Sequence, residues 1–259
     1  MKIVVIGGTG LIGSKLVATL TEHGHEAIAA SPNTGVDTLT GEGLADALNG
    51  ADVVVDVSNS PSFDDDAVLE FFTTSTTNLL AAEKVAGIRH HVALSVVGTD
   101  RLSESGYFRA KIAQEALIKD GGVPYSIVHA TQFFEFVRSI AAASTVDGDA
   151  HLSPALIQPI VSDDVATAVG RIAVGDALNA TIEIAGPDQY GLDELVRIGL
   201  PAYGIEQKVV TDGGARYFGA LLGTRTLLPG EGAEIFETRF EDFLKLQSPR
   251  RPDPQYSDG

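Results

Sequence analysis

Glycines at intervals of three residues directly follow an apolar run at the start of the sequence, and this combination most restricts how the chain can fold. The run Lys2–Ile6 is rich in β-branched residues, as expected of a central parallel strand that is buried on both faces. The segment Leu11–His23 carries apolar residues at helical spacing, and Gly24 follows it. The sequence therefore predicts a strand, a tight turn and a helix in immediate succession.

The three spaced glycines of this turn each have a physical reason to lack a side chain. We expect Gly7 to permit the tight turn, Gly10 to let a pyrophosphate approach the backbone, and Gly13 to let the helix pack against the strand. The exposed N–H groups and the dipole of the helix N-terminus favour an anion. The alternative is a strand-to-helix turn without a ligand. We predict a dinucleotide-binding turn with contacts from Gly7, Thr9, Gly10, Leu11, Ile12 and Gly13.

Strand-like and helix-like patterns then alternate through the first half of the chain. The predicted strands are Glu26–Ala30, Asp52–Val57, His91–Val97 and Tyr125–His129, and the predicted helices are Gly43–Asn49, Asp66–Ala86 and Tyr107–Lys119. Such alternation predicts an α/β fold, a Rossmann-type doubly wound parallel sheet with right-handed crossovers.

After about Thr131 the alternation becomes less regular. Residues Val161–Asp164 are expected to open a helix with an aspartate as its N-cap, Thr181–Ile184 is expected to form a strand, and the chain from Leu192 onward is expected to be mostly helical. This part should form a smaller C-terminal substrate lobe. We expect a nucleotide-binding domain at 1–131, a partly interwoven lobe at 132–247 and a flexible tail at 248–259.

Composition excludes several classes of function. The net charge of −17 disfavours nucleic acid and membrane surfaces as partners, because both are anionic. The absence of cysteine excludes disulfides and thiolate metal sites. His90 and His91 are adjacent on a predicted strand and point to opposite faces, so we expect no metal site. The start of the chain lacks the features of a signal peptide, so we expect a cytoplasmic protein, monomeric or homo-oligomeric.

The residues after the second and third predicted strands indicate which cofactor binds and what contacts its adenosine half. No acidic residue follows Ala30 to bind a ribose 2′-hydroxyl, whereas Ser31 and Asn33 can donate hydrogen bonds to a 2′-phosphate. This favours NADP over NAD. The segment Val57-Ser58-Asn59 follows a strand at the expected ligand edge, so these residues are expected to contact adenine or ribose, although an ordinary strand-ending turn is the alternative. Contacts are also expected from Ala130 and Thr131.

A tyrosine and a lysine four residues apart are the candidate catalytic pair. Tyr107 and Lys111 would share one face of a helix, and the preceding strand would bring Ser95 to the same edge of the sheet. A nearby ammonium lowers the pKa of a tyrosine, which could then protonate an alkoxide formed by hydride transfer. Ser95 would polarise the substrate carbonyl. The alternative is a surface tyrosine and lysine on an amphipathic helix.

These motifs resemble the short-chain dehydrogenase/reductase superfamily, in particular its atypical NmrA-like branch of NAD(P)-binding proteins. The resemblance implies that Ser95, Tyr107 and Lys111 act as carbonyl polariser, acid/base and cofactor-binding lysine. Related chains often have arginine and proline where this one has His129-Ala130, and many have two serines where this one has one. The matching segments are Gly7–Gly13, His91–Asp100, Gly106–Leu117, Tyr125–Phe134, Ile160–Val165 and Ile184–Asp193.

An aromatic segment follows the strand that ends near His129. We expect Val97, Gln132, Phe133 and Phe134 to line a substrate pocket beside the nicotinamide, although core packing explains each phenylalanine equally well. Gln132 is the stronger candidate, because a polar side chain has less reason to be buried there.

Three functions follow from these features. The first is an NAD(P)-dependent oxidoreductase that transfers a hydride between the nicotinamide and a small carbonyl or quinone-like substrate. The second is a non-catalytic NmrA-like regulator that senses NAD(P), because many members of that branch lack the tyrosine that this chain retains. The third is an NAD-dependent epimerase or dehydratase. The third is disfavoured, because the second half of the chain lacks the clustered Lys and Arg that a sugar nucleotide requires.

Overall fold

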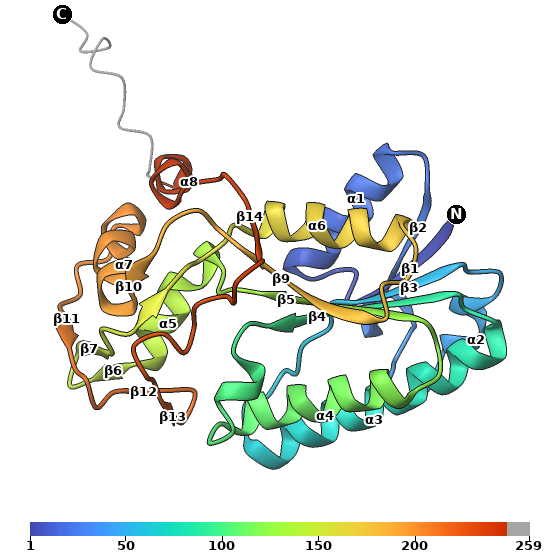
Figure 1. Cartoon of the computed structure of the whole chain (residues 1–259), viewed down its shortest axis with the longest axis horizontal. Coiled ribbons are helices and arrows are strands. Elements are labelled where there is room, and N and C mark those ends of the chain that lie inside the picture. The colour runs from blue at the N-terminus through green and yellow to red at the C-terminus, as the bar shows by residue number, and fades with distance from the viewer. Residues whose placement is uncertain (248–259) are drawn as a thin grey trace, which may run out of the picture.

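A parallel sheet of seven strands forms the centre of the computed structural model, which describes residues 1–247 (Figure 1). The strand order is β14-β9-β5-β4-β3-β1-β2, and every neighbouring pair is parallel. The order reverses between β1 and β3, which places a ligand crevice at the carboxyl ends of these strands. The strands are β1 (Lys2–Ile6), β2 (Glu26–Ala30), β3 (Val53–Asp56), β4 (His90–Val96), β5 (Tyr125–Ala130), β9 (Ala180–Ala185) and β14 (Glu234–Ile235).

Helices cover both faces of the sheet (Figure 1). Alternate residues of β1 supply both layers: Ile3 and Val5 pack against the first group of helices, and Val4 and Ile6 against the second. Because both faces are covered, the four residues that follow Lys2 in this strand are all apolar. One face carries α1 (Leu11–Glu22) and α6 (Ser162–Val174), and the other carries α2 (Leu44–Leu48), α3 (Asp65–Ala86) and α4 (Gly106–Asp120).

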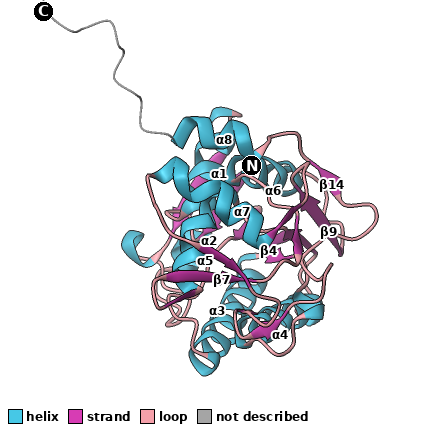
Figure 2. Cartoon of the chain, turned by 90° about the vertical axis from the view of Figure 1, so that its left-hand side faces the viewer, coloured by secondary structure: helices cyan, strands magenta, loops and turns pink. Residues whose placement is uncertain are grey.

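A second region lies beside the carboxyl ends of the strands and has its own core (Figure 2). Phe134, Leu195 and Phe240 are buried at its centre. Its helices are α5 (Val137–Ala143), α7 (Leu192–Gly199) and α8 (Phe240–Gln247). Its short strands are β6 (Thr145–Val146), β7 (Asp149–Leu152), β8 (Leu156–Ile157), β10 (Tyr190–Gly191), β11 (Val209–Thr211), β12 (Arg216–Tyr217) and β13 (Ala220–Leu221).

The predicted parallel sheet is confirmed, and each strand and helix predicted before Thr131 is present with ends that differ by only one or two residues. After Thr131 the chain returns to the sheet as α6, β9 and β14. The division into domains at 131 and 132 remains a prediction. The predicted tail 248–259 lies outside the described residues.

The predicted aspartate cap of α6 is wrong. The N-cap is Val161, and the helix begins at Ser162 with Asp163 and Asp164 in its first turn. The Ser162 N–H donates to the Glu135 carboxylate, with N···O distances of 3.2 and 3.3 Å. A side chain from a distant segment therefore replaces the local cap, which the sequence pattern does not reveal.

The prediction that the chain from Leu192 onward is mostly helical is also wrong. Helix α7 and a short 3₁₀ segment, Leu200–Tyr203, are followed by paired short strands before α8. Glycines such as Gly204 and Gly219, both with positive φ, interrupt any longer helix. Over residues 1–247, no helix combines the length and apolar character that a membrane crossing requires.

We predict that Gly13→Ala destabilises the protein by about 2 kcal/mol or more. A Cβ at this position would lie 2.2 Å from the Gly7 carbonyl oxygen, so the backbone of the turn would have to move. Urea unfolding followed by circular dichroism measures the loss. Gly213→Ala is the control, because its Cβ would meet no atom within 4 Å. Equal stability of the two variants would contradict the packing described for the turn.

Candidate functional site

The glycine turn has the geometry that its sequence predicts. Gly7 has a φ of +77°, and a Cβ there would lie 2.8 Å from the Ser58 nitrogen. Gly13 packs directly on the Gly7 carbonyl oxygen, as described above, and the Gly10 N–H donates to the same oxygen at 2.9 Å. Gly8 has a role that the sequence analysis missed, because its Cβ would lie 2.6 Å from Ala29 Cα of β2. The adjacent pair Gly7-Gly8 was the available signal.

The N-terminus of α1 can accept an anion. Its N-cap is Gly10, and no side chain caps the first turn. Thr9, Gly10 and Leu11 are exposed at this edge, whereas Ile12 is buried behind them. The first N–H groups of α1 therefore have no side-chain cap, and together with the helix dipole they can bind an anion such as a pyrophosphate group.

The residues predicted to contact the adenosine half lie beside this turn. Ser31, directly after β2, is 6% exposed, and its hydroxyl has no hydrogen-bond partner within residues 1–247. Asn33 and Asn59 are exposed, and Val57 is partly buried. Ser58 instead donates from both its N–H and its hydroxyl to Asp56 Oδ1, at 2.9 and 2.6 Å. A buried hydroxyl without a partner at Ser31 suits a polar cofactor group.

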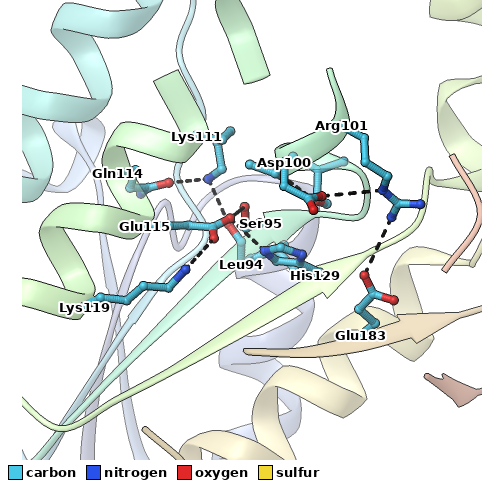
Figure 3. A network of polar contacts seen from close by, with 12 residues as sticks. Leu94, Ser95, Asp100, Arg101, Lys111, Gln114, Glu115, Lys119, His129 and Glu183 are labelled. Carbon is cyan, nitrogen blue, oxygen red and sulfur yellow. Dashed lines mark hydrogen bonds and ion pairs between the residues drawn. The ribbon is translucent and has the colours of Figure 1, made fainter. Parts of the chain in front are cut away.

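Lys111 is a buried ammonium held by a chain of polar contacts (Figure 3). Its Nζ donates to the Leu94 carbonyl oxygen at 3.1 Å and to Gln114 Oε1. Gln114 in turn donates to Asp56 Oδ2 at 3.1 Å. Lys111 Nζ also lies 4.4 Å from the centre of the Phe72 ring. This chain connects the end of β3 to α4, and the sequence analysis missed both Asp56 and Gln114.

The environment of Lys111 shifts the pKa of its ammonium group. Burial lowers the pKa of Lys111 to about 8, although the nearby carboxylates of Asp56 and Glu115 favour the charged form. The ammonium therefore predominates at neutral pH but is lost at a lower pH than for an exposed lysine.

Ser95 contacts a carboxylate that the sequence analysis did not anticipate (Figure 3). Its hydroxyl donates to Glu115 Oε1 at 2.7 Å, and His129 Nε2 lies 2.7 Å from the same oxygen. Lys119 Nζ lies 3.2 Å from Glu115 Oε2. To donate to a substrate carbonyl, the Ser95 hydroxyl would first have to rotate away from Glu115. His129, where related chains have arginine, is thus part of this network.

The electrostatics of Glu115 follow from these neighbours. Burial opposes ionisation, but the hydrogen bonds from His129 and Ser95 and the charge of Lys119 outweigh it and lower the pKa of Glu115 to about 2. A carboxylate at Glu115 therefore holds Ser95 and His129 together over the physiological pH range.

Tyr107 differs from the sequence expectation in its electrostatics. Burial raises the pKa of Tyr107 to about 12, so the expectation that Lys111 lowers it is wrong in this structure. The physical reason is that the ammonium is directed to Leu94 and Gln114, while the tyrosine ring packs among aromatic rings. Tyr107 therefore holds its proton firmly at neutral pH.

The predicted substrate-lining residues separate into two groups. Val97 and Phe134 are 0% and 1% exposed, and Phe134 packs 5.1 Å from the Phe240 ring, so both can shape a pocket only from behind. Gln132 is 6% exposed, and neither atom of its amide has a hydrogen-bond partner within the described chain. The buried Thr131 hydroxyl also has no hydrogen-bond partner within the described chain. The Phe133 ring is partly buried beside Phe136. Ala130, 2% exposed, lies at the end of β5.

The adjacent histidines have separate partners. His90 Nε2 lies 2.8 Å from the Ser126 hydroxyl, and His91 Nδ1 lies 2.7 Å from Glu83 Oε1. In the part of the chain that the structure describes, no three His, Asp or Glu side chains gather as metal ligands.

We predict that Glu115→Gln lowers the free energy of unfolding by about 2 kcal/mol at pH 7, because the native contacts stabilise the ionised carboxylate. The pKa of Glu115 is depressed in the folded protein, so this contribution is present above its ordinary pKa of 4.5 and is lost as the pH falls toward 2. Urea unfolding at several pH values measures the difference. Glu70→Gln, at an exposed position of α3, is the control. A difference that does not shrink in acid would contradict this account.

The sequence of this chain is similar to those of known proteins. Two curated proteins, both named photosystem II assembly factor Ycf39, are similar in sequence. The one from Synechocystis is 23% identical over 216 residues, covering 76% of this chain and 66% of its own length. The one from Cyanophora paradoxa is 27% identical over 149 residues, covering 52% of this chain and 46% of its own. The chain thus matches less than two thirds of the length of either relative.

Solved structures share the fold over nearly the whole chain. A nucleoside-diphosphate-sugar epimerase from Staphylococcus aureus has a TM-score of 0.72 at 19% identity, covering 95% of this chain and 100% of that one. A dTDP-4-dehydrorhamnose reductase from Clostridium acetobutylicum has a TM-score of 0.71 at 16% identity, covering 95% and 98%. At such identities the likeness shows the fold alone.

A family model shows more than these pairwise likenesses. The model described as NAD(P)H-binding matches residues 7–173, which is more than half of the chain and includes the glycine turn, Lys111 and α6. The chain therefore belongs to the NAD(P)H-binding family.

Proposed function

We propose that this protein is an NAD(P)-dependent oxidoreductase of the NmrA-like type, which transfers a hydride between the nicotinamide and a small carbonyl or quinone-like substrate. The observation that carries the proposal is a buried ammonium, Lys111, one helical turn after Tyr107 on α4. The N-terminus of α4 follows the carboxyl end of β4, at the ligand edge of the sheet. The bound cofactor would supply the hydride, and the side chains would orient both partners and deliver a proton.

Lys111 is suited to hold the nicotinamide ribose. An ammonium has three N–H donors, and the contacts to Leu94 and Gln114 use two of them. The third would donate to a ribose hydroxyl. Because Gln114 and Asp56 hold the ammonium in place, its position does not depend on the ligand.

Tyr107 is suited to donate a proton rather than to accept one. With a pKa of about 12, it is a neutral phenol at pH 7. Hydride addition to a carbonyl carbon leaves an alkoxide, which takes the phenolic proton and becomes the alcohol. Oxidation of an alcohol would need the phenolate, which burial disfavours. At pH 7, Tyr107 is therefore already in the protonation state that reduction of a carbonyl requires.

A non-catalytic role is the second candidate, and one specific observation favours it. The Ser95 hydroxyl is directed at Glu115, so the carbonyl polariser is engaged within the protein. The two similar curated proteins are named as assembly factors, which fits a role in binding another protein. A sensor of this kind would bind NAD(P) without turnover.

The proposed mechanism predicts that Tyr107→Phe lowers kcat for carbonyl reduction by at least about 100-fold. The affinity for the cofactor should change little, because Lys111 and the glycine turn remain. NADPH oxidation in the presence of an electrophilic carbonyl measures turnover, and fluorescence titration measures cofactor binding. Tyr125→Phe, at the opposite end of the sheet, is the control.

Retained turnover in Tyr107→Phe would remove Tyr107 from the mechanism. Tight cofactor binding by the unaltered protein without turnover of any carbonyl tested would favour the sensor instead.

We further propose NADP as the preferred cofactor, because the chain has no carboxylate directly after β2 and Ser31 offers a buried hydroxyl there. Ser31→Asp should weaken NADPH binding about tenfold relative to NADH, since a carboxylate repels a 2′-phosphate and accepts from a 2′-hydroxyl. Dissociation constants for both cofactors measure the ratio. Ser31→Ala, which removes the hydroxyl without adding a charge, should weaken NADPH binding relative to NADH by a smaller factor. Tighter binding of NADH by the unaltered protein would overturn the assignment.

A further inference from the structure

A hairpin from the second region reaches the start of α4 and places a phenylalanine at its tip (Figure 1). Strands β12 and β13 pair Tyr217 with Ala220, so Phe218 and Gly219 form a two-residue turn. Both residues have positive φ, +46° at Phe218 and +86° at Gly219. This is the arrangement of a type I′ turn, in which asparagine or glycine is preferred at the first position.

Phe218 is therefore a poor residue for the turn that it occupies. A bulky side chain in the left-handed region is strained, whereas asparagine adopts it readily. Strained residues gather at functional sites, where the surrounding structure holds them in place. The geometry of the turn therefore does not account for a phenylalanine at position 218, whereas the contacts of its ring do.

The Phe218 ring forms a cluster of three aromatic rings with Phe63 and with Tyr107, the candidate proton donor. Its centre lies 5.9 Å from that of Tyr107 and 5.5 Å from that of Phe63, and Phe63 lies 5.7 Å from Tyr107. The three rings come from the hairpin, the start of α4 and the loop before α3. Phe63 is 53% exposed and Phe218 is 42% exposed. Two large apolar rings beside Tyr107 thus remain open to solvent.

The hairpin is held in this position by contacts of its own. Arg216 Nη1 donates to Glu104 Oε2 at 3.2 Å, in the loop before α4, and to the Gly219 carbonyl oxygen at 2.6 Å. Tyr217 is partly buried and packs against the apolar cluster that includes Phe108 of α4, with its ring 4.8 Å from that of Phe218. The exposed ring of Phe218 therefore lies on a tethered element.

We propose that the exposed faces of Phe63 and Phe218 bind a planar, uncharged aromatic ring, and that this ring belongs to the substrate whose carbonyl lies at Tyr107. The assignment of this ring to the substrate rests on the proposed function. Stacking explains why two exposed rings flank the tyrosine and why a strained turn keeps one of them there.

The charges around the cluster favour a neutral ligand. Arg216 is paired with Glu104, and Arg109 Nη2 lies 2.6 Å from Asp65. The arginines of the hairpin and of the first turn of α4 are therefore engaged with carboxylates.

A binding experiment tests the site without relying on catalysis. The probes are 2-naphthamide and its saturated counterpart decahydro-2-naphthamide, titrated into the full chain and measured by calorimetry. The flat aromatic probe should bind at least about tenfold more tightly, because only it can stack. Equal affinity for the two probes would overturn the aromatic site.

Two variants test whether Phe218 and Phe63 cause the preference for the aromatic probe over the saturated one. Phe218→Asn supplies the residue that the turn prefers, so the hairpin should keep or gain stability while the preference for naphthamide falls about fivefold or more. Phe63→Leu should reduce the preference with no change in the turn. Leu221→Ala, which alters a residue of β13 that is 49% exposed, is the control and should leave it unchanged. An unchanged preference in both phenylalanine variants would overturn the assignment.

Turnover separates this proposal from the proposed function. With NADPH, KM should be lower for 2-naphthaldehyde than for decahydro-2-naphthaldehyde, and Phe218→Asn should remove that difference by raising KM for 2-naphthaldehyde. If both aldehydes are reduced with equal KM, the aromatic site is refuted and the oxidoreductase stands. If naphthamide binds selectively but neither aldehyde is reduced, the site stands and the oxidoreductase is refuted.

Discussion

The close approach of three backbone segments at the glycine turn is the constraint on which the rest of the structure depends. The turn contacts Ser58 beyond β3, Ala29 of β2 and the first turn of α1 at distances that leave no space for a Cβ at Gly7, Gly8 or Gly13. These contacts set the spacing of β2, β1 and β3 at their carboxyl ends. The crevice for the nucleotide therefore exists because the backbone, not the side chains, fills this corner.

Helix α4 connects that crevice to the chemistry. It presents Tyr107, Lys111 and Gln114 on the side facing the sheet and α3, and each is held by a different partner. Burying an ammonium costs free energy unless polar groups satisfy it, and Gln114 and Asp56 supply them. The same helix carries Glu115, which satisfies Ser95 and His129. Two buried networks thus position the residues on which the proposed reduction depends.

The second region contributes to the site through a small element rather than through its core. The buried phenylalanine Phe134 stabilises that region, whereas the exposed Phe218 reaches across to Tyr107. For the aromatic segment after β5, substrate contact and core packing were equal alternatives in the sequence, and Phe134 packs in the core of the second region. The aromatic side chains that flank Tyr107 lie on a hairpin and a loop far from it in sequence.

The sequence by itself determined the parallel sheet, the glycine turn and the placement of Tyr107 and Lys111 on one helix. Periodicity and glycine spacing are local properties, and they are readable from neighbouring residues. Only the tertiary structure decided that Lys111 contacts Gln114 rather than Tyr107, that Ser95 contacts Glu115, and that Phe218 lies beside Tyr107. Ser95 and Glu115 come from a strand and a helix, Phe218 and Tyr107 come from a hairpin and a helix, and Gln114 is held in turn by Asp56 of β3. A side chain's partners and pKa therefore depend on what folding brings beside it.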